Sequence, residues 1–311
     1  MQFWVTGRAI VSDFKHSTLK QSTLKQSTFE HSTAWTLVGV DFTSAPSRRK
    51  PITVARGVLD SPLSARPGGA IRVVSVERCP DWATFDGQLN QPGPWVGAFD
   101  LPFGLPRTLV QTLGWPENWR EMIDLYTQLS RDEIRARFRS FCADRPVGHR
   151  FAHRATDGPA RSSPSMKWVN PPVAFMLHAG VPRLLAAGLT LPGLQAGDPD
   201  RIALEAYPAL VARACVGKQS YKSDAAQGAT GPRRAAREAI VASLELGAYG
   251  FDGRPVVLPL GMREQLVDEP GADRLDAVLA LVLAAWALTR REMNWGLPAD
   301  MDPLEGWIVG A

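Results

Sequence analysis

The chain has 311 residues, of which 45% are hydrophobic and 21% are charged, a composition typical of a globular protein with a sizeable buried core. Its formal net charge of +4 at pH 7 is compatible with a polyanionic partner. The three cysteines, Cys79, Cys142 and Cys215, lie far apart, which argues against a disulfide framework or a zinc ribbon and favours a reducing compartment.

The most apolar stretch of the sequence is AVLALVLAAWAL at 277–288. It has twelve residues, whereas a membrane-spanning helix needs about 20. The first residues lack a basic segment followed by a long apolar one, which is the pattern of a secretory leader. We therefore expect a buried core helix at 277–288, no membrane segment and a cytoplasmic protein.

A short repeat marks the beginning of the chain. Residues 16–33, HSTLKQSTLKQSTFEHST, repeat a polar unit of five residues. A period of five matches neither a helix face nor a strand face. We predict that residues 1–34 form a disordered, low-complexity extension and that one α/β domain occupies residues 35–311.

Three neighbouring strands are predicted at the start of this domain. Apolar runs there alternate with links rich in Pro, Ser and Gly, which is typical of a meander. The expected strands lie at 35–42, 51–59 and 70–79. A short helix at 80–89 follows, with Pro80 in its first turn. A fourth apolar strand, within 94–106, ends at Asp100 before a turn.

The rest of the domain is predicted to be mainly helical. Amphipathic helices are expected over 107–143, followed by a basic loop at 144–172. The later elements are a helix at 173–188, a strand at 201–210, a helix at 231–248 and a last helix from Asp273 to about Arg291. This order predicts a mixed α/β domain around one central sheet, with a helical and loop insertion at about 107–200.

Acidic residues occur where these elements begin or end. Asp41 ends the first strand, Asp100 ends the fourth, and Glu205 lies in the fifth. Asp273 and Asp276 open the last helix three residues apart, which places both on one helix face. Each position also has a purely structural explanation, as a helix cap, a first-turn acid, a turn residue or a solvent-facing strand residue.

The apolar strand that ends at Asp41 raises the question of what neutralises this carboxylate, because an unpaired buried charge is costly. Functional groups of α/β sheets gather at strand ends. Several carboxylates brought together there repel one another unless a divalent cation lies among them. Oxygen ligands suit Mg²⁺ or Mn²⁺, and two such ions can promote phosphodiester cleavage.

Five segments together resemble a known family. They are GVDFT, GAFDLPFGLP, EAYPAL, DRLDAVLALVLAAW and LEGWI. They occur in the same order as in a family of predicted nucleases with a ribonuclease H-like fold, and the similarity covers most of 35–311. The start of the last helix is also similar to that of RuvC-type Holliday-junction resolvases.

The resemblance implies a ribonuclease H-like mixed sheet and a metal-dependent nuclease that acts on DNA or RNA. The implied ligands of Mg²⁺ or Mn²⁺ are Asp41, Asp100, Glu205 and Asp276, with Asp273 as a fifth candidate. Family members commonly carry a histidine shortly before the last aspartates, where this chain has Gly271 and Ala272. A general base from that position is therefore not expected.

Two other functions remain open from the sequence. An actin-type or sugar-kinase-type phosphotransferase shares the opening three-strand plan, and DFTSAPSRRK at 41–50 loosely resembles its phosphate-binding turn. Phe42 and Thr43 depart from its aspartate-x-glycine-threonine pattern, and a later glycine-rich adenosine loop is missing. The third possibility is a nucleic-acid-binding scaffold without turnover.

Two basic segments are candidates for contact with nucleic acid. The loop 144–172 mixes arginines with an aromatic ring, a combination that suits phosphate tracking and base stacking. A solvated loop is the alternative reading. The second candidate comprises Lys218, Lys222, Arg233, Arg234 and Arg237, from the basic segments 217–224 and 231–248. A charged helix face is usually only solvated. The candidate contacts are Arg150, Arg154, Arg161, Lys167, Trp168, Lys218 and Lys222.

Cys142, His149 and His153 have a spacing that suggests zinc. Pro146 and Gly148 interrupt any regular helix there, and no fourth ligand is evident. The sequence therefore disfavours zinc.

Overall fold

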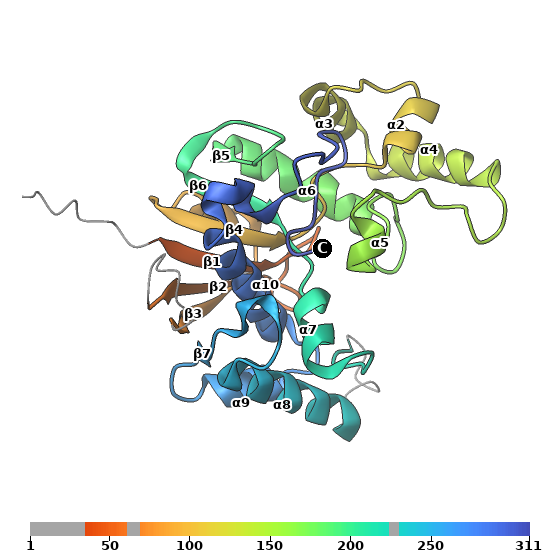
Figure 1. Cartoon of the computed structure of the whole chain (residues 1–311). Coiled ribbons are helices and arrows are strands. Elements are labelled where there is room, and N and C mark those ends of the chain that lie inside the picture. The colour runs from red at the N-terminus through yellow and green to blue at the C-terminus, as the bar shows by residue number, and fades with distance from the viewer. Residues whose placement is uncertain (1–34, 61–68, 224–229) are drawn as a thin grey trace, which may run out of the picture. The chain divides into compact units, whose positions relative to one another are not determined.

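The computed structural model of the chain describes residues 35–60, 69–223 and 230–311, which are organised around one seven-stranded mixed sheet (Figure 1). The strands are β1 (Thr36–Asp41), β2 (Ile52–Leu59), β3 (Ile71–Cys79), β4 (Trp95–Asp100), β5 (Leu189–Thr190), β6 (Asp198–Glu205) and β7 (Val256–Val257). Their order across the sheet is β5-β6-β4-β1-β2-β3-β7. β1, β2 and β3 are antiparallel neighbours, whereas β4 runs parallel to β1 and β6 runs parallel to β4. The predicted mixed sheet and its opening meander are confirmed.

The central strand β1 is covered on both faces. Leu37 packs into one hydrophobic cluster, and Val38 and Val40 pack into a second one on the opposite face. This alternation follows from the two-residue period of a strand. A strand with both faces covered also explains why its sequence is nearly continuously apolar.

The helix α10 (Asp273–Leu288) covers one face of the sheet. Every residue of 277–285 is fully buried. The contact with β1 depends on Gly39, because a Cβ at this position would lie 2.1 Å from the carbonyl oxygen of Ala277. The predicted core helix is confirmed, although it ends before Arg291. The same cluster includes residues of α7 (Ala209–Val216), α8 (Gly231–Leu246) and α9 (Met262–Asp268).

The other face of the sheet is covered by α1 (Trp82–Leu89) and α6 (Val173–Ala186), together with the helices of the insertion. The helical stretch expected at 107–143 divides into α2 (Arg107–Thr112), α3 (Trp119–Gln128) and α4 (Arg131–Ala143). Caps explain these divisions. The Asn118 side chain accepts a hydrogen bond from the backbone of Glu121, and Ser130 forms a capping box with Glu133. The short helix α5 (Asp157–Ala160) lies in the predicted basic loop.

One predicted strand has different bounds, and two short strands were not predicted. The strand expected at 201–210 begins earlier and ends at Glu205, because Pro208 cannot donate a backbone hydrogen bond to a neighbouring strand and instead precedes α7. The strands β5 and β7 have two residues each, too few for an alternating pattern to be recognised.

The predicted extension, residues 1–34, lies outside the described residues. In the described part of the chain, none of the helices combines the length and the apolar character that a membrane crossing requires.

Candidate functional site

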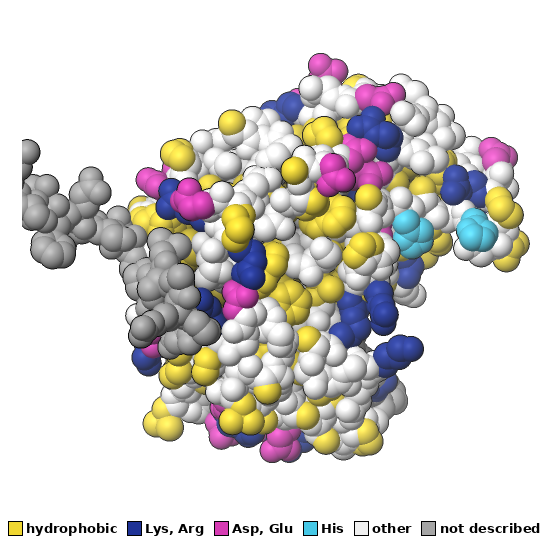
Figure 2. All heavy atoms as spheres, viewed as in Figure 1, with side chains coloured by type: hydrophobic (Ala, Val, Ile, Leu, Met, Phe, Trp, Pro, Cys, Tyr) yellow, Lys and Arg dark blue, Asp and Glu magenta, His cyan; other side chains and the backbone are white. Residues whose placement is uncertain are grey.

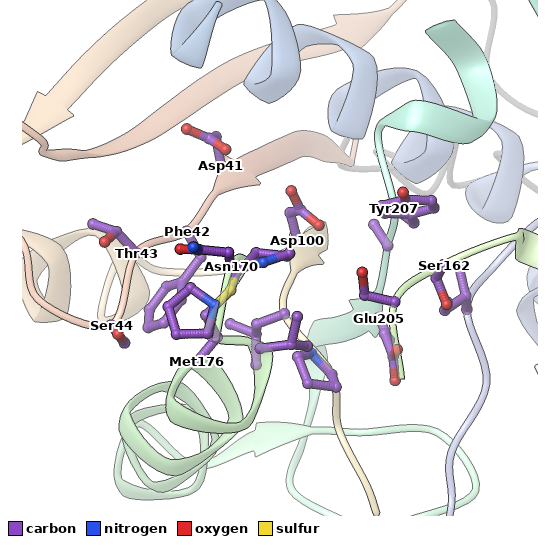
Figure 3. A pocket seen from close by; sticks show the side chains of 18 of the residues that line it. Asp41, Phe42, Thr43, Ser44, Asp100, Ser162, Asn170, Met176, Glu205 and Tyr207 are labelled. Atoms are coloured by element: carbon purple, nitrogen blue, oxygen red, sulfur yellow. The ribbon is translucent and has the colours of Figure 1, made fainter. Parts of the chain in front are cut away.

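A cavity of about 600 Å³ opens at the carboxyl ends of β1, β4 and β6, beside the start of α6 (Figure 3). Its charged lining residues are Asp41, Lys50, Asp100, Arg154, Glu205 and Lys222. Phe42, Leu101 and Met176 contribute to an apolar wall. Ligands of α/β sheets bind at the carboxyl ends of parallel strands, in cavities of this size. This cavity is therefore the candidate functional site.

Asp41 and Asp100 end adjacent parallel strands and lie directly opposite each other in the register. Residues paired in this way point to the same face of the sheet, and Figure 3 shows the two side chains next to each other at the strand ends. Asp41 is only 9% exposed. Within the described ranges, neither carboxylate forms a hydrogen bond or a close ion pair. Two carboxylates without direct partners thus face one cavity.

Burial, reinforced by repulsion from Asp276, raises the pKa of Asp41 well above its ordinary value, although Lys222 acts in the opposite direction. Burial also raises the pKa of Asp100 to about 7, again against the attraction of Lys222. Both shifts have the direction expected of carboxyl groups that lack a direct counter-charge. A cation entering the cavity would favour the ionised form of both groups.

Asp276 lies in the first turn of α10 and is 1% exposed. It accepts a hydrogen bond of 2.7 Å from the Tyr221 hydroxyl and forms an ion pair with the Lys222 ammonium. Asp273 pairs with Lys50 at 2.7 Å. Neither Asp273 nor Asp276 lines the cavity, whereas their lysine partners do.

Glu205 points to the opposite face of the sheet. It is paired in the register with Phe99, the residue before Asp100, and successive residues of a strand point to opposite faces. Figure 3 shows its carboxylate directed away from Asp41 and Asp100. The Arg154 guanidinium binds both Glu205 oxygens, at 2.6 and 2.8 Å, and the Phe103 N–H donates at 2.9 Å.

The pair of Arg154 and Glu205 belongs to a buried polar cluster. Arg154 is 3% exposed, and its guanidinium also contacts Asp157 at 3.0 Å and the Glu305 carbonyl oxygen at 3.0 Å. The Glu305 carboxylate in turn accepts hydrogen bonds from the N–H groups of Ala155 (2.8 Å) and Arg107 (2.7 Å). These contacts tie the 154–157 segment to β6 and to the last residues of the chain.

The residues predicted to contact nucleic acid lie in different environments. Arg150, Arg161 and Lys218 are exposed. Arg154 is buried in the cluster just described and also lines the cavity. Trp168 packs partly against the second hydrophobic cluster, with its ring centroid 5.4 Å from that of Phe151. Lys167 is half-buried, and Lys222 pairs with Asp276.

Metal-ligand geometry is incomplete in this conformation. In residues 35–60, 69–223 and 230–311, no group of three or more His, Cys, Asp or Glu side chains is arranged to hold a metal ion. Two of the acidic residues form ion pairs instead, Glu205 with Arg154 and Asp276 with Lys222. Cys142 is buried, whereas His149 and His153 are exposed.

Sequence reasoning missed four residues of this region. Lys50 was read as part of a turn-rich link, and Tyr221 as part of a basic segment. Glu305 lies in LEGWI, one of the segments that carried the family resemblance, and that was the available signal. Arg237 belongs to the second basic candidate, for which a solvated helix face is the usual reading, but it is 3% exposed and donates to the Tyr221 carbonyl oxygen, next to Lys222.

Comparisons with known proteins give one match. A sequence model of the family described as "Protein of unknown function (DUF429)" matches residues 63–299, more than half of the chain. No curated protein and no solved structure matches the chain.

Proposed function

The chain belongs to the DUF429 family of proteins of unknown function, and we propose that it is a metal-dependent nuclease that hydrolyses phosphodiester bonds of DNA or RNA. The proposal includes a ribonuclease H-like arrangement of the sheet. An antiparallel meander β1-β2-β3 joined to parallel β4 and β6 supports that arrangement.

One observation carries the proposal. Asp41 and Asp100 lie side by side in the register of parallel strands, face a cavity, and form no direct hydrogen bond or ion pair with a described residue. A folded protein does not ordinarily leave two neighbouring carboxylates in this state, because each destabilises the other. A divalent cation is the ligand that would remove this repulsion.

The donor set fits Mg²⁺ or Mn²⁺, since both prefer carboxylate oxygens and retain coordinated waters. Asp41 and Asp100 would hold the ion, and Asp276 would support it from the start of α10. Asp273 forms an ion pair with Lys50, and Glu205 forms one with Arg154. We therefore assign these two acids to holding the basic residues of the cavity wall in position. When bound, a divalent ion supplies activation of water and stabilisation of charge on a phosphate oxygen.

Residues of the chain itself would position the substrate. Lys50 and Lys222 line the cavity, and their positive charges favour a phosphate group there. Phe42 and Leu101 are almost fully buried and form part of the cavity wall. Their apolar side chains exclude water from that side of the cavity. The cavity therefore offers an acidic end for the cation and a less polar wall for the attached nucleotide (Figure 3).

Positive charge on the surface supports a nucleic-acid substrate. Figure 2 shows Lys and Arg side chains gathered on the face over the region of α5 and α7. Arg161 follows α5 and Lys218 follows α7, and both are exposed. Such residues bind the phosphate backbone without selecting a sequence.

A phosphotransferase of the actin or sugar-kinase type is the second candidate. The observation that favours it is the link after β1, whose residues Thr43 and Ser44 line the same cavity beside Asp41. Hydroxyl groups next to a strand-end aspartate suit the binding of a nucleotide phosphate. The two candidates differ in whether ATP is consumed.

The deciding experiment is a cleavage assay with labelled single-stranded and double-stranded DNA and RNA in Mn²⁺, Mg²⁺ or EDTA. We expect cleavage with a divalent ion and its loss in Asp41→Asn and Asp100→Asn. Asp60→Asn is the matched control, because Asp60 follows β2 at the other end of β1 and pairs with Arg72 on the surface. Its activity should equal that of the unaltered protein.

Cleavage that persists in Asp41→Asn would place the activity in a contaminant or at another site. Protection of the protein by ATP without cleavage of any nucleic acid would favour the phosphotransferase. Metal binding without either activity would leave the nucleic-acid-binding scaffold as the better description.

A further inference from the structure

Lys222 differs from an ordinary nucleic-acid-binding lysine. We propose that its ammonium group permanently occupies one cation position of the acidic site, so that the site binds one divalent ion fewer than its carboxylates would otherwise admit. The inference deepens the proposed function and rests on it for the identity of the ion. It concerns the residues Asp41, Asp100, Asp276 and Lys222.

The contacts of Lys222 point inward. Its side chain is half-exposed, yet its ammonium forms an ion pair with Asp276, which is 1% exposed. Lys222 also lines the cavity that Asp41 and Asp100 face. Its positive charge is therefore in contact with Asp276 and shares one cavity with the two strand-end carboxylates.

The backbone around Lys222 is fixed by neighbours from three directions. The Tyr221 hydroxyl donates to Asp276 at 2.7 Å, and the buried Arg237 guanidinium donates to the Tyr221 carbonyl oxygen at 2.7 Å. The Ser223 N–H donates to the Pro270 carbonyl oxygen at 3.0 Å. An ordinary surface lysine lacks such contacts around it, and its long side chain keeps its rotamer freedom. The position of Lys222 is thus built into the fold.

Charge balance gives the same result. Asp273 is already paired with Lys50. The remaining carboxylates, Asp41, Asp100 and Asp276, carry three negative charges when ionised, and Lys222 compensates one of them. Two negative charges remain, which one divalent cation neutralises. With Lys222 removed, Asp276 would be left as an uncompensated buried carboxylate beside the site, and a second cation could take the vacated position.

The experiment counts bound Mn²⁺ in the full chain, by isothermal titration calorimetry and by the electron paramagnetic resonance signal of free Mn²⁺. We expect one ion in the unaltered protein and two in Lys222→Met. Lys222→Arg keeps the charge and should bind one. Lys218→Met is the matched control, because it removes the charge of an exposed lysine four residues away that does not line the cavity. It should also bind one.

The difference between variants tests the inference separately from the proposed function. If the unaltered protein binds no ion and Lys222→Met binds one, the metal-dependent function fails while the role of Lys222 stands. Equal ion counts in the unaltered protein and Lys222→Met would overturn the inference, and so would an extra ion in Lys218→Met. Lys222→Gln provides a second neutral variant. Failure of both neutral variants to fold in saturating Mn²⁺ would also overturn it, because a metal ion should replace the lost charge.

Discussion

Asp100 has a pKa of about 7 in the folded chain, compared with 3.8 for an ordinary aspartate, chiefly because it is buried. Between these two pH values the folded chain binds more protons than the unfolded chain. The free energy of unfolding of the metal-free protein should therefore fall as pH rises from about 4 to about 7. Below this pH window the protonated Asp100 carboxyl group does not destabilise the fold. Above the window its buried charge lowers the free energy of unfolding by the full amount.

Asp100→Asn should consequently stabilise the protein in EDTA at pH 8, by about 1–3 kcal/mol. The full pKa difference would correspond to roughly 4 kcal/mol, and access of water to the cavity reduces it. The gain should shrink toward zero at pH 4, where the carboxyl group is protonated. Urea unfolding at a series of pH values measures this. Asp200→Asn, at an exposed site, should not change the pH dependence, and an equal gain at all pH values would contradict the explanation.

Arg154 joins Glu205 and Asp157 at a site where all three residues are at most 3% exposed. Removal of its charge leaves two buried carboxylates without their main partner. We expect Arg154→Met to destabilise the protein by about 3–5 kcal/mol. Arg120→Met removes a surface ion pair with Asp124, in which both side chains are half-exposed, and should cost at most about 1 kcal/mol.

Chemical unfolding measures the free energy of unfolding of Arg154→Met, Arg120→Met and the unaltered protein. Similar small losses in the two would show that Arg154 is not needed to compensate the buried carboxylates.

The helix α10 and the strand β1 are in contact through their backbones. A Cβ at Gly39 would lie 2.1 Å from the Ala277 carbonyl oxygen and 2.2 Å from the Leu281 nitrogen. Since neither atom belongs to a flexible side chain, the whole helix would have to move. Gly39→Ala should therefore destabilise the protein by about 3 kcal/mol or more, and displace Asp276 relative to Asp41.

Gly87 provides the opposite case in α1. A Cβ there would meet no atom within 4 Å, so Gly87→Ala should stabilise the protein by about 0.5–1 kcal/mol through helix propensity. Thermal melts of the two variants test the pair of expectations. A stable Gly39→Ala variant would mean that α10 can shift along the sheet without loss of packing.

The protein as a whole brings two hydrophobic clusters onto opposite faces of one sheet and leaves the cavity at the end of its central strands. A divalent ion that binds only the folded state should stabilise the entire fold. At 100 times its dissociation constant, Mn²⁺ should add about 2.7 kcal/mol and raise the melting temperature by roughly 5–10 °C.

This stabilisation should be lost in Asp41→Asn and kept in Asp60→Asn. Differential scanning calorimetry at several Mn²⁺ concentrations measures it. An increase of equal size in Asp41→Asn would place the ion elsewhere on the protein.

Much of the fold could be predicted because the signals are local. The apolar runs identified β1, β2, β3 and β4, and the strand ends at Asp41 and Asp100 were located from the change to turn residues. The i, i+3 spacing placed Asp273 and Asp276 together at the start of α10. Short elements such as β5 and β7 gave no signal, because their hydrogen bonds depend on neighbours distant in the sequence.

The sequence by itself determined which residues end the central strands and which acids begin the last helix, because strand and helix periods are properties of adjacent residues. It also shows that Glu205 shares a strand face with Ala203, but not which face of the sheet that is. The register with β4 decided this, by pairing Glu205 with Phe99 instead of Asp100. Tertiary structure likewise decided the partners, Arg154 for Glu205 and Lys222 for Asp276. Each pair joins segments more than 50 residues apart, and only chain folding brings such charges together.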